Sequence, residues 1–139
     1  MTDWWQWSPK KEEDALTFAV VGVGRFGTAV CRELINNGAD VLAADYSEKA
    51  IDDLRQLEPS IEARVIDCTD EESMKESGIL EMNTVVVGIS EPIEASITTT
   101  LIAKDSEGTK VKRVIARATS DLHEKMLKRV GADKVVFPS

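Results

Sequence analysis

A glycine-rich turn, Gly22-Val23-Gly24-Arg25-Phe26-Gly27, holds the residues of this chain that are best placed to do chemistry. It follows the apolar segment Phe18–Val21 and precedes a segment with helical periodicity. In such a turn the first glycine allows the tight bend, the second lets the backbone approach a pyrophosphate, and the third lets the helix pack closely on the strand. Ligand phosphates then meet backbone N–H groups and the positive end of the helix dipole. The spacing therefore predicts a phosphate site, and a turn that merely permits packing is the alternative.

An acidic residue at the expected distance supports this prediction. Asp45 lies 18 residues after Gly27, at the end of the next apolar segment, and Tyr46 and Ser47 follow it directly. A carboxylate at this position accepts hydrogen bonds from the ribose hydroxyls of an adenosine and repels a 2′-phosphate. We therefore expect ribose binding around Asp45, Tyr46 and Ser47, and a preference against NADP. A helix-capping or turn role is the alternative for Asp45.

Arg25 is an unusual residue within a phosphate-binding turn. The backbone N–H groups already serve two phosphates, and a cation in the first turn of a helix is unfavourable beside the positive end of the dipole. A more anionic ligand, such as a triphosphate, would explain it, because a guanidinium pairs with phosphate oxygens through a fork of donors. An exposed arginine that reaches solvent or a carboxylate of a neighbouring subunit is the alternative.

Candidate ligand contacts also follow three later strands, because ligands bind outside the carboxyl ends of an open parallel sheet. These candidates are Asp67, Cys68 and Thr69, then Gly88, Ile89 and Ser90, and finally Arg117. The first group is expected near the adenine, the second beside the phosphates and ribose, and Arg117 at the same edge of the sheet. Thr69, with Glu72 three residues later, equally fits a helix capping box, and Arg117 equally fits an exposed loop.

The elements that must position these residues alternate between two patterns. Six short and almost continuously apolar segments indicate strands covered on both faces: Thr17–Gly22, Asp40–Asp45, Ala63–Asp67, Thr84–Ile89, Val111–Ala116 and Lys134–Phe137. Five segments with helical periodicity lie between them. This alternation predicts an α/β fold, a doubly wound parallel six-stranded sheet with the Rossmann-like order 3-2-1-4-5-6.

Apolar spacing also predicts which faces of the last two helices are buried. The fourth helix begins at Pro92 and has the stripe Ile93, Ile97 and Leu101, and the fifth has the stripe Leu122, Met126, Leu127 and Val130. On this spacing His123, the only histidine, falls on the outer side of the fifth helix and is expected to be solvated.

No catalytic apparatus is visible in the sequence. Hydride transfer needs a substrate pocket and an acid or base near the nicotinamide. The sequence contains no Tyr-x-x-x-Lys pair, nucleophile elbow, HExxH motif or paired Cys/His ligand set. We therefore expect a protein that is not an enzyme and has no metal site.

Length, composition and charge narrow the class of protein further. The 139 residues fit one domain, and 42% hydrophobic with 30% charged residues is typical of folded soluble chains. Seventeen basic and 25 acidic residues give a net charge of −8, which argues against nucleic-acid binding. No apolar run approaches the roughly 20 residues of a membrane span, and the N-terminus lacks the order of a secretory signal. Cys31 and Cys68 are expected to be reduced thiols, with a disulfide or metal site as the alternative. These observations predict an acidic, cytoplasmic domain.

The N-terminal segment differs from the rest of the chain. Residues 1–15 read as a tail, and residues 16–139 as the folded nucleotide-binding domain. Trp4, Trp5 and Trp7 lie in this tail without strand or helix periodicity. They either pack back on an apolar patch or stay loose in solvent, or they anchor the chain to a partner or membrane surface.

The motifs together resemble a known family. Phe18–Gly27, Val41–Asp45, Asp67–Asp70 and Val130–Pro138 are similar to the corresponding motifs of the RCK/KTN (TrkA-N) domain of potassium-uptake regulators, above all of Ktr-type cytosolic subunits. The resemblance covers Leu16 to Pro138. It implies binding of ATP or ADP, with NAD(H) as an alternative. It also implies a homo-oligomer, a dimer or an octameric ring in the full-length protein, whose nucleotide state gates a membrane-embedded potassium channel or transporter subunit.

The resemblance also implies roles for single residues. Gly22, Gly24 and Gly27 would hold the phosphates, Asp45 the ribose and residues 67–69 the adenine, while Arg25 would meet the terminal phosphate across a subunit interface. Two departures stand out. Ktr-type subunits usually continue into a second lobe, whereas this sequence ends at Ser139, and Ser139 stands where an acidic residue often helps to hold a divalent ion. The sequence thus predicts either a truncated chain or a subunit without the second lobe.

Two other functions stay open on the sequence alone. The chain could be the cofactor-binding half of an NAD-dependent oxidoreductase, which hydride transfer would reveal. It could also be a protein-interaction module whose glycine turn has no ligand, in which case no adenine nucleotide would bind.

Overall fold

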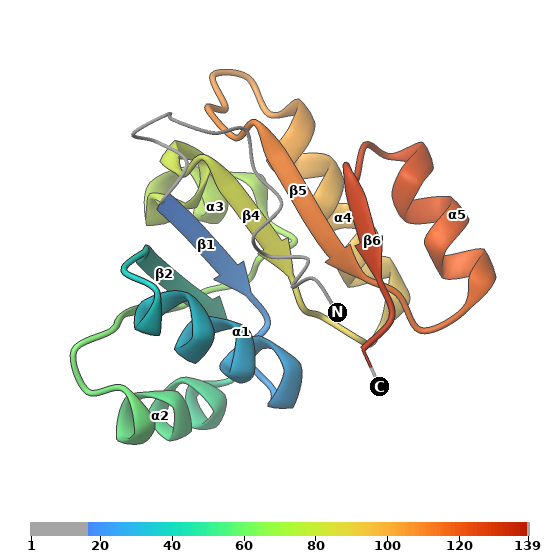
Figure 1. The fold of residues 1–139 in the computed structure, drawn as a ribbon. Coiled ribbons are helices and arrows are strands. Elements are labelled where there is room, and N and C mark those ends of the chain that lie inside the picture. The colour runs from blue at the N-terminus through green and yellow to red at the C-terminus, as the bar shows by residue number, and fades with distance from the viewer. Residues whose placement is uncertain (1–16, 139) are drawn as a thin grey trace.

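A computed structural model describes residues 17–138 as six strands and the helices between them (Figure 1). In chain order the elements are β1 (Thr17–Val21), α1 (Arg25–Asn36), β2 (Asp40–Asp45), α2 (Glu48–Leu57), β3 (Glu62–Val65), α3 (Glu71–Ser77), the 3₁₀ turn η3 (Ile79–Glu81), β4 (Thr84–Val87), α4 (Ile93–Asp105), β5 (Arg113–Arg117), α5 (Asp121–Arg129) and β6 (Lys134–Val136). The strands pair in the order β3-β2-β1-β4-β5-β6, and every pair is parallel. The predicted fold class and strand order are confirmed. The predicted tail, residues 1–15, lies outside the described residues, as do residues 16 and 139.

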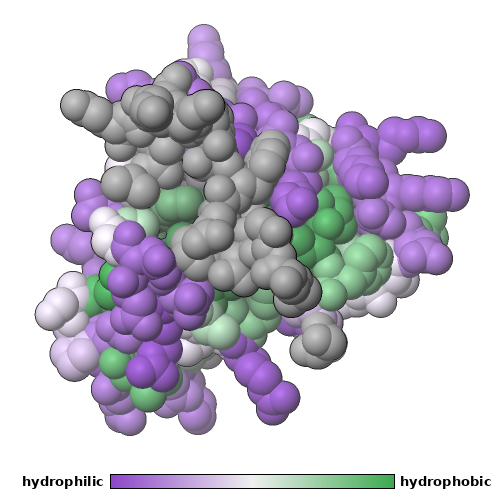
Figure 2. All heavy atoms as spheres, in the orientation of Figure 1, coloured by the Kyte–Doolittle hydropathy of each residue, from purple (hydrophilic) through white to green (hydrophobic). Residues whose placement is uncertain are grey.

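Helices cover the sheet in two groups (Figure 1). Side chains of α1 and α2, such as Leu34 and Leu54, pack with Val20 and Val86 on one face. Side chains of α3, η3, α4 and α5 pack with the alternate residues of the same strands on the other face. Figure 2 shows hydrophobic side chains gathered over β5 and β6 on the side turned toward the viewer. Central strands are therefore buried on both faces, as their continuous apolar sequence predicts.

The two longest helices bury different kinds of residue. The face of α1 that contacts the sheet follows helical spacing and consists of Gly27, Val30, Cys31 and Leu34. The buried face of α4 consists of Ser96, Thr99, Thr100 and Ala103, while Leu101 is 42% exposed. The predicted stripe of α4 is therefore wrong at Leu101, because the small residues, and not the large apolar ones, fit between this helix and the sheet.

The fifth helix corrects a second prediction. Its buried positions are His123 and Leu127, and Leu122 and Met126 lie 67% and 41% exposed. His123 has no exposed surface at all, so the prediction of a solvated histidine is wrong. The spacing of four residues from His123 to Leu127 is a regular helical stripe that includes a polar residue, which is why apolar spacing alone missed it.

Helix starts differ from the prediction at two points. The carboxylate of Asp70, and not the hydroxyl of Thr69, caps α3 by accepting from the N–H of Ser73 at 2.9 Å. The capping box predicted from Thr69 and Glu72 is therefore wrong by one residue. Pro92 precedes α4 as its N-cap residue instead of forming its first turn. Among the described helices, none has the length and apolar character that a membrane crossing requires.

Candidate nucleotide site

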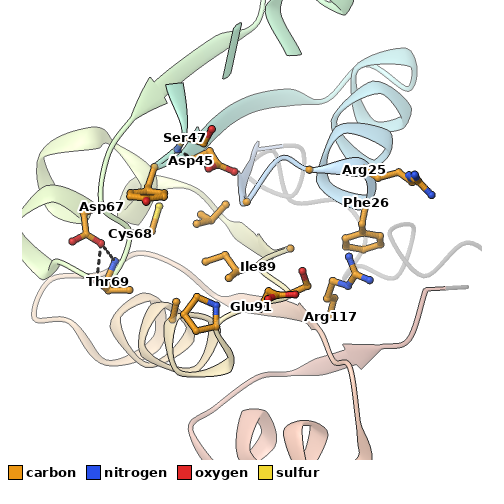
Figure 3. A pocket seen from close by; sticks show the side chains of 18 residues that line it. Arg25, Phe26, Asp45, Ser47, Asp67, Cys68, Thr69, Ile89, Glu91 and Arg117 are labelled. Atoms are coloured by element: carbon orange, nitrogen blue, oxygen red, sulfur yellow. Dashed lines mark hydrogen bonds between the residues drawn. The ribbon is translucent and has the colours of Figure 1, made fainter. Parts of the chain in front are cut away.

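A cavity of about 480 Å³ opens at the carboxyl ends of the parallel strands (Figure 3). Among its lining residues are candidates from every predicted group: Gly22, Gly24, Arg25, Phe26, Asp45, Tyr46, Ser47, Asp67, Cys68, Thr69, Gly88, Ile89, Ser90 and Arg117. Two predicted residues, Val23 and Gly27, do not line it and are buried beneath the turn. The parallel sheet brings these residues together because all six strands end at one edge.

The glycines of the turn differ in what surrounds them. Gly22 has a φ of +93°, and a Cβ placed on it would lie 2.8 Å from the backbone nitrogen of Ile89. A Cβ on Gly27 would lie 1.9 Å from the carbonyl oxygen of Gly22, so this position permits helix α1 to pack against the turn. A Cβ on Gly24 would meet no described atom within 4 Å. Gly24 therefore leaves space open where a ligand can approach the backbone.

Asp45 holds the glycine turn in place. Its Oδ2 accepts a hydrogen bond from the backbone N–H of Val23 at 2.8 Å, and its Oδ1 accepts one from the N–H of Ser47 at 2.8 Å. The side-chain oxygen of Ser47 in turn accepts from the N–H of Ala50 and caps α2. The turn role weighed for Asp45 is thus present in the structure. Each carboxylate oxygen has a second lone-pair direction, which leaves acceptor capacity toward the cavity.

The loop after β3 forms one end of the cavity. Asp67 accepts hydrogen bonds from the Thr69 backbone N–H at 2.9 Å and the Thr69 hydroxyl at 2.6 Å, and these bonds lower the pKa of the Asp67 carboxyl. Burial raises the pKa of the neighbouring Cys68 thiol to about 12, so it stays neutral. The Thr99 hydroxyl of α4 donates to the Cys68 carbonyl at 3.0 Å. This end of the cavity is therefore connected directly to α4. Tyr46, 79% exposed, also lines the cavity.

Two arginines stand at the other end of the cavity. The guanidinium of Arg117 lies over the ring of Phe26, 5.4 Å from its centroid. Its Nε is buried and has no hydrogen-bond partner among the described residues. Arg25 is exposed, and in Figure 3 its side chain extends from the start of α1 away from the centre of the cavity. Arg117 is thus the better placed of the two to meet a ligand in this cavity.

The helix that begins at the glycine turn has an open N-terminus. Within the described chain no side chain caps α1, whereas side chains of Ser47, Asp70 and Ser120 cap α2, α3 and α5. Backbone N–H groups at an uncapped N-terminus need acceptors from water or a ligand. Together with the helix dipole they favour an anion at this point of the cavity.

Sequence reasoning missed four residues that line the cavity. They are Val21, Glu91, Pro92 and Ala95. Glu91 and Pro92 directly follow the predicted residues Gly88–Ser90, so the same strand-end rule extended by two residues would have found them. Figure 3 shows Glu91 at the same end as Arg117. In the described part of the chain, no group of three or more His, Cys, Asp or Glu side chains could hold a metal ion.

A parallel sheet in the order 3-2-1-4-5-6, with a glycine-rich turn after its first strand, defines a Rossmann-type α/β domain. The family model of the TrkA-N domain matches residues 18–138, and the chain therefore belongs to this family. The resemblance inferred from the sequence motifs is confirmed.

Similarity to known proteins agrees with this assignment. The Ktr system potassium uptake protein C of Bacillus subtilis (strain 168) is 39% identical over 121 residues, which are 87% of this chain and 52% of that protein. The chain spans about half the length of the curated relatives it matches.

Solved structures share the fold. The NAD(P)-binding domain of an exopolyphosphatase-related protein from Archaeoglobus fulgidus is 27% identical, with a TM-score of 0.73, and the match covers 88% of this chain and 87% of that one. The structure of GsuK bound to ADP is 15% identical, with a TM-score of 0.70, over 87% of this chain and 31% of that chain. At this identity the GsuK match shows the fold alone.

Proposed function

We propose that this chain is a nucleotide-sensing regulatory domain that binds ATP or ADP, with NAD(H) as the alternative, and controls a membrane-embedded potassium channel or transporter. The observation that carries the proposal is the uncapped N-terminus of α1, which opens beside the Asp45 carboxylate in one cavity. Membership of the TrkA-N family and similarity to a Ktr potassium uptake protein support the potassium-transport setting. The matching domain from Archaeoglobus fulgidus, at 27% identity, is described as NAD(P)-binding, which supports a nucleotide ligand.

The chemistry of the cavity suggests how an adenosine nucleotide would lie in it. The adenine would occupy the end formed by residues 67–69, with the ribose hydroxyls donating to Asp45. The phosphates would then reach the turn from Gly22 to Gly27, where the α1 N–H groups favour negative charge. A volume of about 480 Å³ lies within the range of ligand sites, roughly 300–1,000 Å³.

A regulatory role requires that binding energy differ between nucleotide states. ATP and ADP share the adenosine and differ at the terminal phosphate, so only groups near that phosphate can separate them. Arg117 has a buried Nε without a partner at this end, and Arg25 can reach a phosphate from the first turn of α1 or across a subunit interface. A charge-assisted pair contributes about 1.5–3 kcal/mol, which is similar to a typical allosteric coupling of about 1–3 kcal/mol.

The rest of the proposal concerns the oligomeric state of the protein and its location in the cell. We propose a homo-oligomer, a dimer or a ring in the longer protein, held at the cytoplasmic side of the membrane by its transporter partner. Light scattering of the chain with and without nucleotide measures the assembly. A chain that remains monomeric at every concentration would contradict this part of the proposal and leave nucleotide binding untouched.

Calorimetric titration with ATP, ADP, NADH and NADPH tests ligand binding. We expect the first three to bind at least about tenfold more tightly than NADPH, because Asp45 repels a 2′-phosphate. Asp45→Ala should weaken all three, whereas Asp40→Ala, at the opposite end of β2, is the matched control and should change nothing. Equal binding of NADPH and NADH would contradict the ribose role of Asp45, and failure of every nucleotide to bind would overturn the proposed function.

Two arginine variants identify the group that reads the terminal phosphate. If Arg25 reads it, Arg25→Ala should lower ATP affinity about ten- to a hundredfold, the equivalent of one charge-assisted pair, and ADP affinity much less. If Arg117 is the reader, Arg117→Ala produces this selective loss instead. Equal losses for ATP and ADP in both variants would show that neither arginine distinguishes the two nucleotides.

A further inference from the structure

The only histidine of the chain, His123, is completely buried between α5 and α4, and the proposed nucleotide contacts do not use it. The backbone N–H of Thr119 donates to its Nδ1 at 3.1 Å. Because a backbone N–H can only donate, Nδ1 is the acceptor and the ring proton sits on Nε2. Nε2 lies 2.7 Å from the Ser96 hydroxyl, which donates to the carbonyl of Ile93 at 2.9 Å. The contacts form one directed relay from Thr119 through His123 and Ser96 to Ile93.

This relay connects two segments that border the nucleotide cavity. Thr119 is two residues beyond Arg117, which ends β5 and lines the cavity. Ser96 follows Ala95 in the first turn of α4, and Ala95 and Pro92 also line the cavity. The imidazole is therefore the side-chain link between the β5–α5 loop and the start of α4. His123 is hydrogen-bonded to Thr119, which is two residues from Arg117 in the chain, and to Ser96 at the start of α4. A shift of the imidazole would therefore move both segments.

The relay requires a neutral ring. A second proton on Nδ1 would face the Thr119 N–H, so that two donors would meet at 3.1 Å, and only the Thr119 hydroxyl, 3.3 Å away, could accept it. Burial lowers the pKa of His123, and no charged group offsets this effect.

Charged residues on the surrounding elements do not stabilise a protonated ring. They include Glu94 on α4, Asp121, Glu124, Lys125, Lys128 and Arg129 on α5, and Arg117 on β5. Among the described residues, none of them shares a hydrogen bond or ion pair with the imidazole, and Glu124 instead pairs with Lys128 at 3.1 Å. Protonation therefore has no compensating carboxylate within the relay.

We propose that neutral His123 is a positioning residue for the nucleotide cavity: it holds the β5–α5 loop against α4, presents Arg117 to the ligand phosphates, and couples nucleotide binding to proton release. The inference rests on the proposed function, because it assumes that a nucleotide occupies the cavity. It assigns to this domain a sensitivity to pH as well as to nucleotide.

Reciprocity supplies the first test. If the neutral ring favours the nucleotide, the nucleotide must favour the neutral ring by the same factor. The ring of the single histidine can be followed by NMR during a pH titration of the full chain, with and without saturating NAD⁺ or ADP. We expect the ligand to lower the pKa of His123 by about half a unit to one unit, which corresponds to about three- to tenfold weaker binding by the protonated protein. A pKa that does not move, or that rises, on ligand saturation overturns the inference.

Variants supply the second test, with NAD⁺ as the ligand because none of its groups titrates between pH 5.5 and 7.5. The wild-type affinity should fall as pH decreases, by no more than about fivefold at pH 5.5, because burial lowers the pKa of His123 and full protonation lies below this range. His123→Asn keeps an acceptor for the Thr119 N–H and cannot titrate, so its affinity should stay near the neutral wild-type value and be independent of pH. His123→Leu should bind weakly at every pH, and Ser96→Ala should weaken binding at pH 7.5 without loss of fold.

A matched control separates positioning from general packing. Thr100→Val alters another buried hydroxyl of α4 that has no hydrogen-bond partner within the described chain, and it should leave both the affinity and its pH profile unchanged. If the wild-type protein binds nucleotide with the same pH-independent affinity as His123→Asn, this inference is overturned and the proposed function is not. Wild-type protein that binds no nucleotide at any pH overturns the proposed function, and the inference with it.

Discussion

The sheet has two halves, β1–β3 with helices α1 and α2, and β4–β6 with helices α4 and α5. Both halves alternate strands with helices, but their helices bury different kinds of side chain. Helix α1 in the first half contacts the sheet through Val30, Cys31 and Leu34, whereas α4 in the second half does so through Ser96, Thr99 and Thr100. Apolar packing has little directionality, but it is sensitive to changes of side-chain volume. The buried hydroxyls of Ser96 and Thr99 are hydrogen-bonded, and because such bonds require defined angles they fix the orientation of α4.

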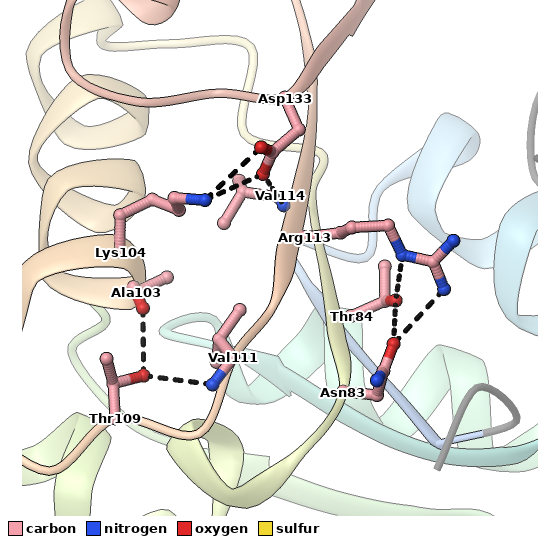
Figure 4. Close-up of polar contacts among 9 residues, drawn as sticks. All are labelled: Asn83, Thr84, Ala103, Lys104, Thr109, Val111, Arg113, Val114 and Asp133. Carbon is pink, nitrogen blue, oxygen red and sulfur yellow. Dashed lines mark hydrogen bonds and ion pairs between the residues drawn. The ribbon is translucent and has the colours of Figure 1, made fainter. Parts of the chain in front are cut away.

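Further polar contacts of the second half lie near the amino ends of β4 and β5, away from the cavity (Figure 4). Asp133 accepts from the Val114 N–H at 2.7 Å and pairs with Lys104 of α4 at 2.9 Å. Arg113 is buried and donates to the Thr84 hydroxyl at 3.2 Å and to the Asn83 side-chain oxygen at 3.1 Å. The comparison shows that Asp45 holds the turn of the first half, while polar contacts hold the second half; under our proposals the first half would bind the ribose and the second half would respond to ligand and proton.

The largest expected effect falls in the rigid first half. Gly27→Ala places a Cβ against the Gly22 carbonyl, and the backbone of the turn must move to relieve the contact. We expect a loss of about 3 kcal/mol or more in the free energy of unfolding, measured by urea denaturation, together with loss of nucleotide binding. Gly24→Ala is the control, since its Cβ meets no described atom within 4 Å, and it should keep stability within about 1 kcal/mol. Equal stability of both variants would contradict the packing role of Gly27.

A pair of isosteric variants measures the polar character of the second half. Thr99→Val removes the donor to the Cys68 carbonyl and should lower the free energy of unfolding by about 1–2 kcal/mol. Thr100→Val removes a hydroxyl without a partner among the described residues and should be neutral or slightly stabilising. Denaturant unfolding of both proteins gives the difference. If the two substitutions cost the same, the hydrogen bond from Thr99 does not hold α4 to the β3–α3 loop.

The smallest expected effect is a pH dependence of stability that comes from the second half. Because burial lowers the pKa of His123 in the folded protein, the unfolded chain binds the proton more tightly. The stabilisation is complete above the unfolded pKa of about 6.5 and is lost as pH falls toward the folded value, at no more than about 1.4 kcal/mol per pH unit. Melting temperatures of wild type and His123→Asn between pH 7.5 and 5.5 measure it. A wild-type decrease no steeper than that of the variant would exclude His123 as its source.

Sequence reasoning succeeded where one physical pattern determined the structure. Continuous apolar strands and the glycine turn predicted the sheet order, and the strand-end rule placed Asp45, Asp67 and Arg117 at one cavity. It failed on α4 and α5, where polar residues occupy the buried face. Leu101 and Leu122 satisfied an apolar spacing, but the space against the sheet fits Ser96 and His123, whose hydrogen bonds satisfy each other. Such pairing joins residues 27 positions apart and is invisible to a local pattern.

The hydrogen bonds from Val23 and Ser47 to Asp45 have a consequence for the speed of ligand exchange. They hold the glycine turn in the folded protein, so a nucleotide that binds as we propose would not wait for a loop to close. Capture would then proceed at a similar rate for each adenosine nucleotide, and affinity differences would reside in the dissociation rate. The lifetime of each bound nucleotide would set how quickly the domain replaces one with another when their concentrations change.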